Sequence, residues 1–200
     1  MPDESELVTA ACTALAGIKH TIAEAEPHVA DGAGLYAIHG APEIWQQLGL
    51  GDPPDDRPLY VGKAEASLRA RDLRQHFGTG ATGSSTVRRT FAAMLRDALG
   101  FRGVPRDKSN PRKWSHYALS DEHEIALTEW MRANLKLAVW AKAPECGDLH
   151  DVEKRVLARL VPPLNIQDNP TSPWLKQVKG ARKVMAKDAQ AWAVAKGFKV

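Results

Sequence analysis

Two short apolar segments separated by a proline-rich break constrain the fold of this chain more than any other feature. Residues 34–39 alternate apolar and polar positions between glycines, and residues 58–64 form a second segment of the same kind. Such alternation is typical of β-strands. The intervening sequence DPPDD at 52–56 excludes regular structure. We therefore predict two antiparallel strands joined by a long loop, a length that favours a lid or specificity role over a tight hairpin.

Helical periodicity accounts for most of the remaining chain. Helices are predicted over 3–26, 67–77, 121–135, 149–160 and 173–195, and another begins at the capping residues 84–86. Short strands are predicted at 114–119 and 137–140, and the basic segment 102–113 is predicted to be a loop. These elements predict one α/β (α+β) domain over residues 1–200, with a small central antiparallel or mixed sheet flanked by helices.

Charge is distributed unevenly along the chain, although the net charge is only +3. Residues 1–59 hold ten acids and two Lys or Arg, whereas residues 60–118 hold twelve Lys or Arg and four acids. Residues 170–200 add seven bases against one acid. This segregation predicts one face that attracts a polyanion; the alternative is that the charges only solvate helix surfaces.

Composition argues against a membrane protein and against a secreted, disulfide-rich one. No apolar segment approaches the length that spans a bilayer, and the N-terminus lacks a basic-then-apolar signal pattern. Cys12 and Cys146 lie far apart and outside any metal-binding spacing, so we interpret them as buried thiols in a reducing compartment. We expect a cytoplasmic protein with no membrane partner.

Glu153 is the most informative single residue, because it lies near the middle of an apolar helical stripe. The stripe is formed by Leu149, Val152, Val156, Leu157 and Leu160. A carboxylate on a buried face is costly unless it is neutralised, paired or bound to a metal. The alternative is that Glu153 reaches the rim of the helix and pairs with Arg71 or another base.

Short motifs occur in a fixed order along the chain, beginning with Gly-Leu-Tyr at 34–36 and Tyr-Val-Gly at 60–62. Leu68 and Arg71 follow, then Glu153, and Asn165 twelve residues later. This ordered set resembles the GIY-YIG nuclease family, which is named after the two tripeptides; here Leu and Val stand in place of Ile. The resemblance covers about residues 32–170 and implies a core of that extent with an insertion at about 80–145.

The resemblance implies a metal-dependent endonuclease that hydrolyses DNA with a water nucleophile. Glu153 would hold one Mg²⁺, or Mn²⁺, together with waters. Tyr36 or Tyr60 would orient or deprotonate the water, and Lys63 could lower the pKa of a phenol by its charge. Arg71 would hold the scissile phosphate.

Two further points concern Asn165 and His76. Asn165 would orient backbone or tyrosine groups rather than react. Relatives often carry a histidine four residues after the arginine, whereas His76 stands five after Arg71, which rotates it about 140 degrees around an unbroken helix. Either the helix begins later than predicted, or His76, a candidate catalytic residue, contacts a phosphate or a neighbouring group instead.

Basic residues outside this set are the candidate nucleic-acid contacts. They are Arg69, Arg74, Arg88, Arg89, Arg112, Lys113, Lys176 and Lys179. Arg88 and Arg89 lie in the first turn of their predicted helix, where a phosphate would also meet free backbone amides. We expect the insertion to clamp the substrate.

The sequence is compatible with several alternatives. The chain could be a catalytically silent nucleic-acid-binding module of the same fold, or a membrane-surface protein that uses its basic last helix. A zinc site at His116 and His123, or at His150 and Glu153, lacks a third ligand. RNA is an alternative substrate. The length is similar to that of the family's restriction endonucleases, for which a two-fold dimer would suit a palindrome.

Overall fold

A four-stranded antiparallel sheet forms the centre of the molecule, in the order β1-β4-β2-β3. The strands are β1 (His20–Thr21), β2 (Gly34–Gly40), β3 (Tyr60–Ala64) and β4 (Leu135–Ala141). The computed structural model describes residues 4–70, 75–107, 111–144 and 146–198. The antiparallel alternative of the predicted sheet is therefore confirmed, as is the pairing of the two strands around 34–39 and 60–64.

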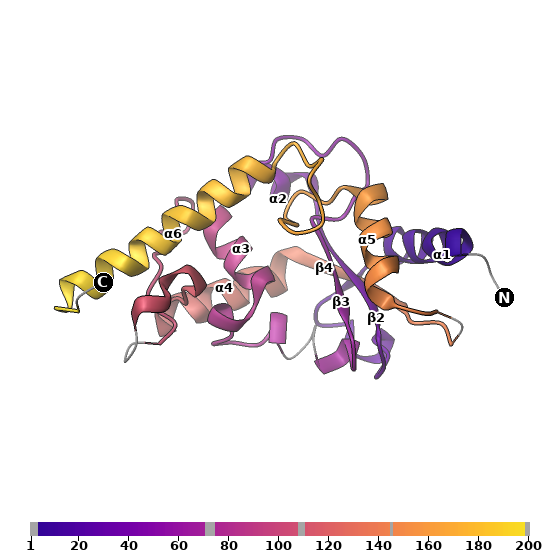
Figure 1. Cartoon of the computed structure of the whole chain (residues 1–200), viewed down its shortest axis with the longest axis horizontal. Helices are drawn as coiled ribbons and strands as arrows, with labels where there is room; N and C mark the ends of the chain where they lie inside the picture. The colour runs from indigo at the N-terminus through magenta and orange to yellow at the C-terminus, as the bar shows by residue number, and fades with distance from the viewer. Residues whose placement is uncertain (1–3, 71–74, 108–110, 145, 199–200) are drawn as a thin grey trace.

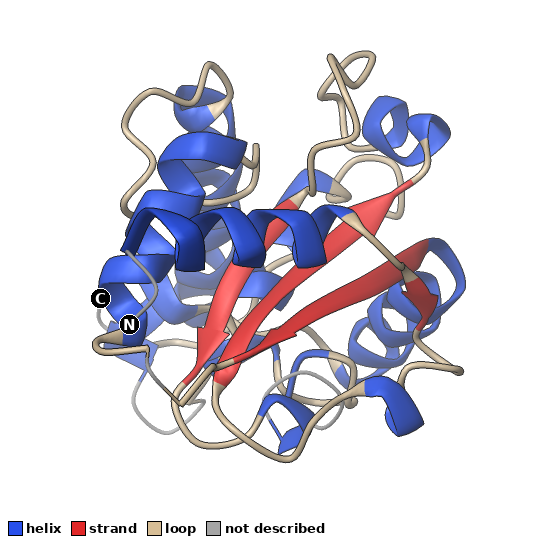
Figure 2. Ribbon diagram, turned by 90° about the vertical axis from the view of Figure 1, so that its right-hand side faces the viewer, coloured by secondary structure: helices blue, strands red, loops and turns tan. Residues whose placement is uncertain are grey.

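Helices cover both faces of this sheet (Figures 1 and 2). On one face pack α1 (Glu4–Ala16) and α5 (Leu149–Leu160). On the other lie α2 (Pro42–Gln47), α3 (Thr86–Met94), α4 (Asp121–Asn134) and α6 (Leu175–Ala195). The described residues also include the 3₁₀ segments η1 (Glu26–His28), η3 (Thr82–Ser84) and η4 (Pro111–His116). The result is an α+β fold with the sheet between two helical layers.

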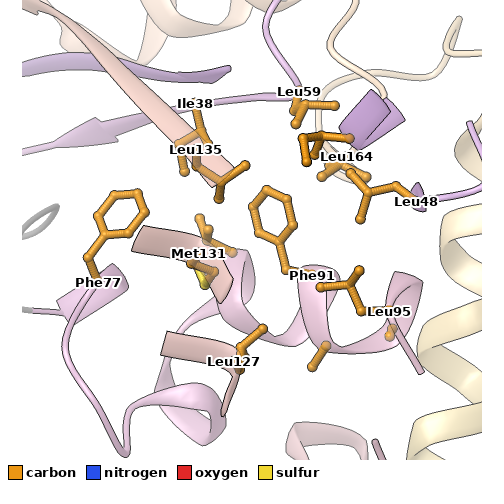
Figure 3. Close-up of a cluster of buried hydrophobic side chains, with 14 of the residues drawn as sticks. Ile38, Leu48, Leu59, Phe77, Phe91, Leu95, Leu127, Met131, Leu135 and Leu164 are labelled. Atoms are coloured by element: carbon orange, nitrogen blue, oxygen red, sulfur yellow. The ribbon is translucent and has the colours of Figure 1, made fainter. Parts of the chain in front are cut away.

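The pleat of β2 divides the core into two clusters. Leu35 and Ala37 face α1 and α5, whereas Tyr36 and Ile38 face the larger cluster under α3, α4 and α6. Figure 3 shows Ile38 and the ring of Phe91 in this larger cluster. Both clusters are buried, so β2 is a fully covered strand and the register of its side chains is fixed.

The N-terminal helix is shorter than predicted. It ends at Ala16 instead of residue 26, and Ile18, assigned to its apolar stripe, is 77% exposed. His20 and Thr21 instead pair with Leu137 and Lys136 of β4. Helical spacing continues past Gly17, but a free edge of β4 offers this segment hydrogen bonds that local periodicity cannot show.

Two other predicted elements differ from the structure. The strand predicted at 114–119 is replaced by η4 and a single bridge between Val104 and Ala118. The predicted insertion at 80–145 contains α3 and α4, but it also contains β4, which lies inside the sheet. A strand with partners on both sides cannot be peripheral, so the sheet itself draws on this segment.

No helix in the described ranges combines the length and apolarity needed to cross a bilayer.

Candidate active site

A polar cavity of about 280 Å³ opens beside β3, the edge strand of the sheet. It is lined by Tyr36, Tyr60, Lys63, His76, Thr86, His150, Glu153, Leu157, Asn165, Ile166, Gln167 and Asp168. Because β3 has a neighbour on one side only, side chains from both faces of the sheet can meet around its free edge. Six of the seven predicted catalytic residues are therefore neighbours here, although they are spread from position 36 to position 165.

The glycine of the second tripeptide, Gly62, makes room for this arrangement. Gly62 lies directly across the strand pair from Tyr36, and a Cβ built on Gly62 would collide with the Tyr36 hydroxyl and come within 2.6 Å of its Cζ. The same Cβ would stand 2.9 Å from Cε1 of Tyr60. The two tyrosine rings have centroids 6.1 Å apart. A side chain at Gly62 would thus displace one phenol or both.

The Tyr36 hydroxyl contacts the imidazole ring of His76, and the other nitrogen of that ring contacts Ser85. Tyr36 Oη lies 2.7 Å from His76 Nε2, and His76 Nδ1 lies 2.8 Å from Ser85 Oγ. Both Tyr36 and His76 are 1% exposed. Ser85 is also the N-cap of α3, where its Oγ accepts a hydrogen bond from the Arg88 amide. The orientation of the His76 ring is therefore tied to the start of α3.

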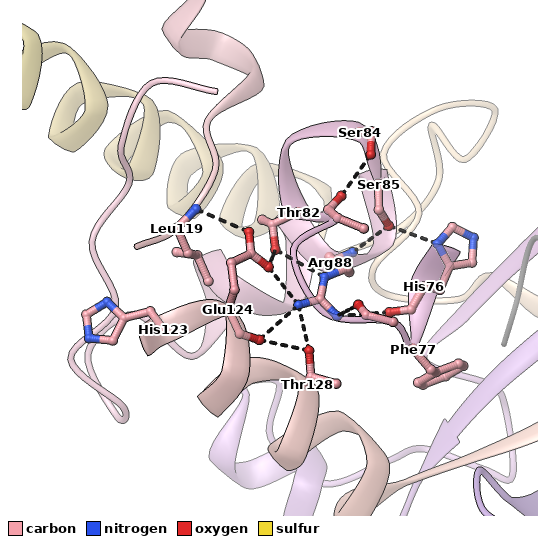
Figure 4. Close-up of polar contacts among 12 residues, drawn as sticks. His76, Phe77, Thr82, Ser84, Ser85, Arg88, Leu119, His123, Glu124 and Thr128 are labelled. Atoms are coloured by element: carbon pink, nitrogen blue, oxygen red, sulfur yellow. Dashed lines mark hydrogen bonds and ion pairs between the residues drawn. The ribbon is translucent and has the colours of Figure 1, made fainter. Parts of the chain in front are cut away.

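A buried ion pair between Arg88 and Glu124 lies next to the segment that carries His76 (Figure 4). Arg88 is fully buried and its Nη2 lies 2.8 Å from Oε2 of Glu124. The guanidinium also donates to Thr82 Oγ1 at 3.1 Å and to Thr128 Oγ1 at 3.0 Å. Another nitrogen, Nη1, donates to the carbonyl oxygen of His76 at 3.2 Å. A charge this deep is tolerated because its donors have partners, and the pair fixes the main chain at His76.

His76 reaches the site despite the spacing that argued against it. A rotation of about 140 degrees holds for an unbroken α-helix, whereas Ala70, Gln75 and His76 are π-helical. A π-helical turn takes in an extra residue compared with an α-helical turn. The angle expected for an unbroken α-helix therefore does not apply at His76.

Glu153 lies on the opposite side of the sheet edge, on α5. Its side chain is 14% exposed, and its Oε2 lies 3.6 Å from His150 Nδ1. Burial raises the pKa of Glu153, while the charge of Lys63 and the contact with His150 work to lower it. The carboxylate is therefore partly desolvated, and a cation beside it would favour its ionised form.

Lys63 extends into the cavity from the α5 side of β3. Its Nζ pairs with Glu65 Oε1 at 2.5 Å. Partial burial works to lower the pKa of Lys63, but the bond to Glu65 and the charges of Glu65, Glu153 and Asp148 raise it overall. Lys63 thus carries a full positive charge next to Glu153. Its predicted effect on a tyrosine pKa stays a prediction.

Asn165 completes the free edge of β3. Its Oδ1 accepts from the Val61 amide at 2.9 Å, and its Nδ2 donates to the Val61 carbonyl at 2.7 Å. The side-chain amide thus forms hydrogen bonds with the N–H and the C=O of Val61, two main-chain groups that could otherwise pair with a fifth strand. The contacts are those of a residue that positions the strand between Tyr60 and Gly62.

The donor set around Glu153 fits a hydrated magnesium ion better than a zinc ion. Among the described residues, no three His, Cys, Asp or Glu side chains gather as a metal cluster. Zinc is usually held by three or four such ligands, whereas magnesium keeps several waters and uses one or two carboxylates. A partly desolvated Glu153 in a polar cavity can supply the single carboxylate that a hydrated magnesium ion needs.

The predicted nucleic-acid contacts differ in their exposure to solvent. Lys176 and Lys179 are exposed on α6, and Arg69 is partly buried with Nη2 donating to the Val29 carbonyl at 3.3 Å. The surface contact predicted for Arg88 is wrong, because this residue is fully buried against Glu124.

Other predicted contacts are hidden or undescribed. Arg89 is only 6% exposed and is not a surface contact either. Arg71 and Arg74 lie outside the described residues, as do the side chains of Arg112 and Lys113.

Several residues at the site were absent from the predicted set. Thr86 and Asp168 line the cavity, and Ser85 holds His76. Ser85 was recognised as a helix cap from its sequence context, but its contact with a ring nine positions earlier has no local signal.

The family model described as GIY-YIG catalytic domain matches residues 53–184. No curated protein and no solved structure matches the chain. The matched segment contains Tyr60, His76, Glu153 and Asn165, and the preceding strand with Tyr36 pairs with β3 in the sheet. Because the match covers more than half of the chain, the protein belongs to the GIY-YIG family, a family of nuclease-type enzymes.

Proposed function

We propose that this protein is a metal-dependent DNA endonuclease that hydrolyses a phosphodiester with water. The observation that carries the proposal is the meeting of Tyr36, Tyr60, His76 and Glu153 in one cavity. GIY-YIG nucleases act on DNA, and membership of that family supports the substrate class. The segregated basic residues of the chain support a polyanionic substrate independently.

The Tyr36–His76 contact is suited to accept the proton of the attacking water. With Nδ1–H donating to Ser85 Oγ, His76 Nε2 is an acceptor for the Tyr36 hydroxyl proton at 2.7 Å. Tyr36 oxygen then takes a proton from water as its own proton moves to Nε2, which leaves an imidazolium. The hydroxide attacks phosphorus, the phosphorus–oxygen bond to the leaving group breaks, and the leaving oxygen is protonated by solvent.

Glu153 and Lys63 provide the electrostatics at the other end of the cavity. Glu153 would hold the divalent ion, which would supply Lewis acidity toward a phosphate oxygen. Lys63, close to Glu153, is placed to attract the phosphate, and Asn165 keeps β3 and Tyr60 in position. These residues orient the substrate and stabilise charge without forming a covalent intermediate.

A plasmid-nicking assay tests the proposal. Supercoiled DNA should be nicked with MgCl₂ and should remain intact with a chelator. Glu153→Gln should reduce the rate at least about 100-fold, because a metal ligand is lost. Glu129→Gln, the same change at an exposed position on α4, should leave it unchanged.

Two results would contradict this assignment. Nicking that persists in Glu153→Gln or in chelator would remove the metal role of Glu153. DNA retention without nicking in any divalent metal would instead indicate a catalytically silent binding module. Repeating the assay with RNA of the same sequence decides between the two nucleic acids.

A further inference from the structure

Three arginines gather next to the cavity where α3 meets α6 and the loop before η4. Arg89, on α3, is 6% exposed, and Arg182, on the α6 turn that contacts α3, is partly buried. Arg106 is exposed, and its side-chain stem lies against Gly83, where a Cβ would come within 2.6 Å of Arg106 Cγ. We call these three residues the arginine cluster.

Within the described ranges, no carboxylate forms an ion pair with any member of the cluster. Arg89 donates only to neutral oxygens, the Gly83 carbonyl at 2.7 Å and Thr86 Oγ1 at 3.2 Å. Its buried Nε has no hydrogen-bond partner. Arg182 donates to Thr90 Oγ1 at 3.3 Å. Arg88, one position before Arg89, differs from the cluster in this respect, because it forms an ion pair with Glu124.

Burial affects the charges of Arg89 and Arg182, and Arg89 also feels the charges of the other two arginines. Burial lowers the pKa of Arg89 to about 10, and the neighbouring charges of Arg182 and Arg106 contribute to this shift. Burial also lowers the pKa of Arg182, against the influence of Tyr117 and Tyr60. Guanidinium groups that are buried together without an acid are unfavourable unless an anion joins them.

The cluster borders the candidate active site. Thr86, which receives the hydrogen bond from Arg89, lines the cavity, and Tyr60 is an electrostatic neighbour of both Arg89 and Arg182. The arginines come from the α3 and α6 side of the sheet, whereas Glu153 comes from α5 on the other side. The arginine cluster and Glu153 therefore approach the cavity from opposite faces of the sheet.

We propose that the arginine cluster binds a backbone phosphate next to the one that is cleaved. Arg106 and Arg182 would contact the phosphate from the exposed side, and Arg89 would add its charge from beneath. The planar fork of arginine matches two phosphate oxygens at once. This inference rests on the proposed function only for the identity of the anion, a nucleic-acid phosphate.

The contribution of the arginine cluster to DNA affinity can be measured with the Glu153→Gln protein in the presence of a chelator, because the DNA is then not cleaved. Arg182→Met should weaken binding about 10-fold and reduce the slope of log affinity against log salt by about 1. Arg106→Gln, at an exposed position, should act in the same direction without a risk to folding. The control is Lys136→Met, which removes one exposed charge on β4, two strands away from β3.

Thermal unfolding with inorganic pyrophosphate tests the site independently of DNA cleavage. Pyrophosphate should raise Tm in wild type and in Glu153→Gln, and this rise should be lost in Arg182→Met. Without ligand, Arg182→Met should keep or raise Tm, because it removes an uncompensated buried charge, whereas a purely structural arginine would lower it.

The outcomes separate the two proposals. If pyrophosphate stabilises through Arg182 but no nucleic acid is cleaved, the proposed function fails and the anion site stands. If DNA is cleaved while Arg182→Met and Arg106→Gln bind it as well as Lys136→Met does, the anion site is overturned.

Discussion

The Tyr36 hydroxyl and Nε2 of His76 lie 2.7 Å apart, although 40 positions separate the two residues in sequence. His76 is held at its second ring nitrogen by Ser85, 2.8 Å away. Contacts at both nitrogens fix the orientation of the ring, so the hydroxyl of Tyr36 and the cap of α3 act on the same group.

Removing the Tyr36 hydroxyl should slow the chemical step and leave substrate binding nearly intact. Tyr36→Phe keeps the ring that packs in the core but breaks the contact with His76, so kcat should fall about 10²- to 10⁴-fold with little change in KM. Single-turnover nicking measures this step. Tyr117→Phe deletes a buried hydroxyl that donates to the Arg89 carbonyl, and it should lower stability without a comparable loss of rate. Equal rate losses in both variants would remove the specific role of Tyr36.

Ser85→Ala should reduce activity by more than its loss of a helix cap explains. Both Ser85 and Ser120 are N-caps, of α3 and α4, and either serine-to-alanine change should cost about 1 kcal/mol of unfolding free energy. Only Ser85 also contacts His76, so only Ser85→Ala should lower kcat and shift the pH dependence of kcat. The comparison uses urea unfolding beside pH–rate profiles. Indistinguishable profiles for Ser85→Ala and Ser120→Ala would show that Ser85 acts only as a cap.

Gly62→Ala should damage both stability and activity. The new methyl group would occupy the space of the Tyr36 phenol, and overpacking of this kind costs about 1–3 kcal/mol. The Tyr36–His76 contact should be broken in the same variant. Gly147→Ala is the matched control, because a Cβ there meets nothing within 4 Å. Thermal unfolding and nicking are the two measurements, and a Gly62→Ala protein with wild-type values of both would contradict the steric argument.

His39 should make the protein less stable as pH falls from about 6.5 toward 4. Burial lowers the pKa of His39 from 6.5 to about 4, although its bond to the Leu15 carbonyl and the charge of Asp56 oppose the shift. The unfolded chain then binds a proton that the folded protein excludes. Stability from this residue is therefore complete above about pH 6.5 and is lost on acidification, up to about 3 kcal/mol.

Urea unfolding at pH 7.5, 6 and 5 checks this dependence. His39→Gln should lower stability at pH 7.5 but flatten the slope between pH 6.5 and 5, because the titrating group is gone. All other acids and histidines are common to both proteins and cancel in the comparison. Parallel slopes in wild type and His39→Gln would show that His39 does not titrate as described.

Elements that depend on local pattern were predictable. The two strands around Tyr36 and Tyr60 and the helix that carries Glu153 lie close to the predicted bounds. Strand alternation and helical stripes repeat within a few residues, so the sequence shows them without knowledge of the partner. The N-terminal helix was overextended because the segment at His20 is decided by hydrogen bonds to β4.

The sequence predicted which residues form the core of the candidate site, but it did not predict which basic residues are buried beside it. The family motifs identified Tyr36, Tyr60, Glu153 and Asn165 as a set, and the structure brings them to one cavity. Arg88 looked the same in sequence as any surface arginine of a basic helix. Its burial depends on Glu124, an acid 36 positions away that sequence spacing does not connect with it.

The sequence alone determined the strand and helix periods and the place of Glu153 on an apolar stripe. These are properties of residues within one or two turns of each other. Tertiary structure alone decided that His76 meets Tyr36 and that Asn165 closes the edge of β3. It also decided that Arg89 and Arg182 lie together with no ion-paired acid among the residues that the structure describes. The physical reason is that burial and pairing energies belong to groups distant in the chain, and only the folded backbone sets which of these groups share a low-dielectric space.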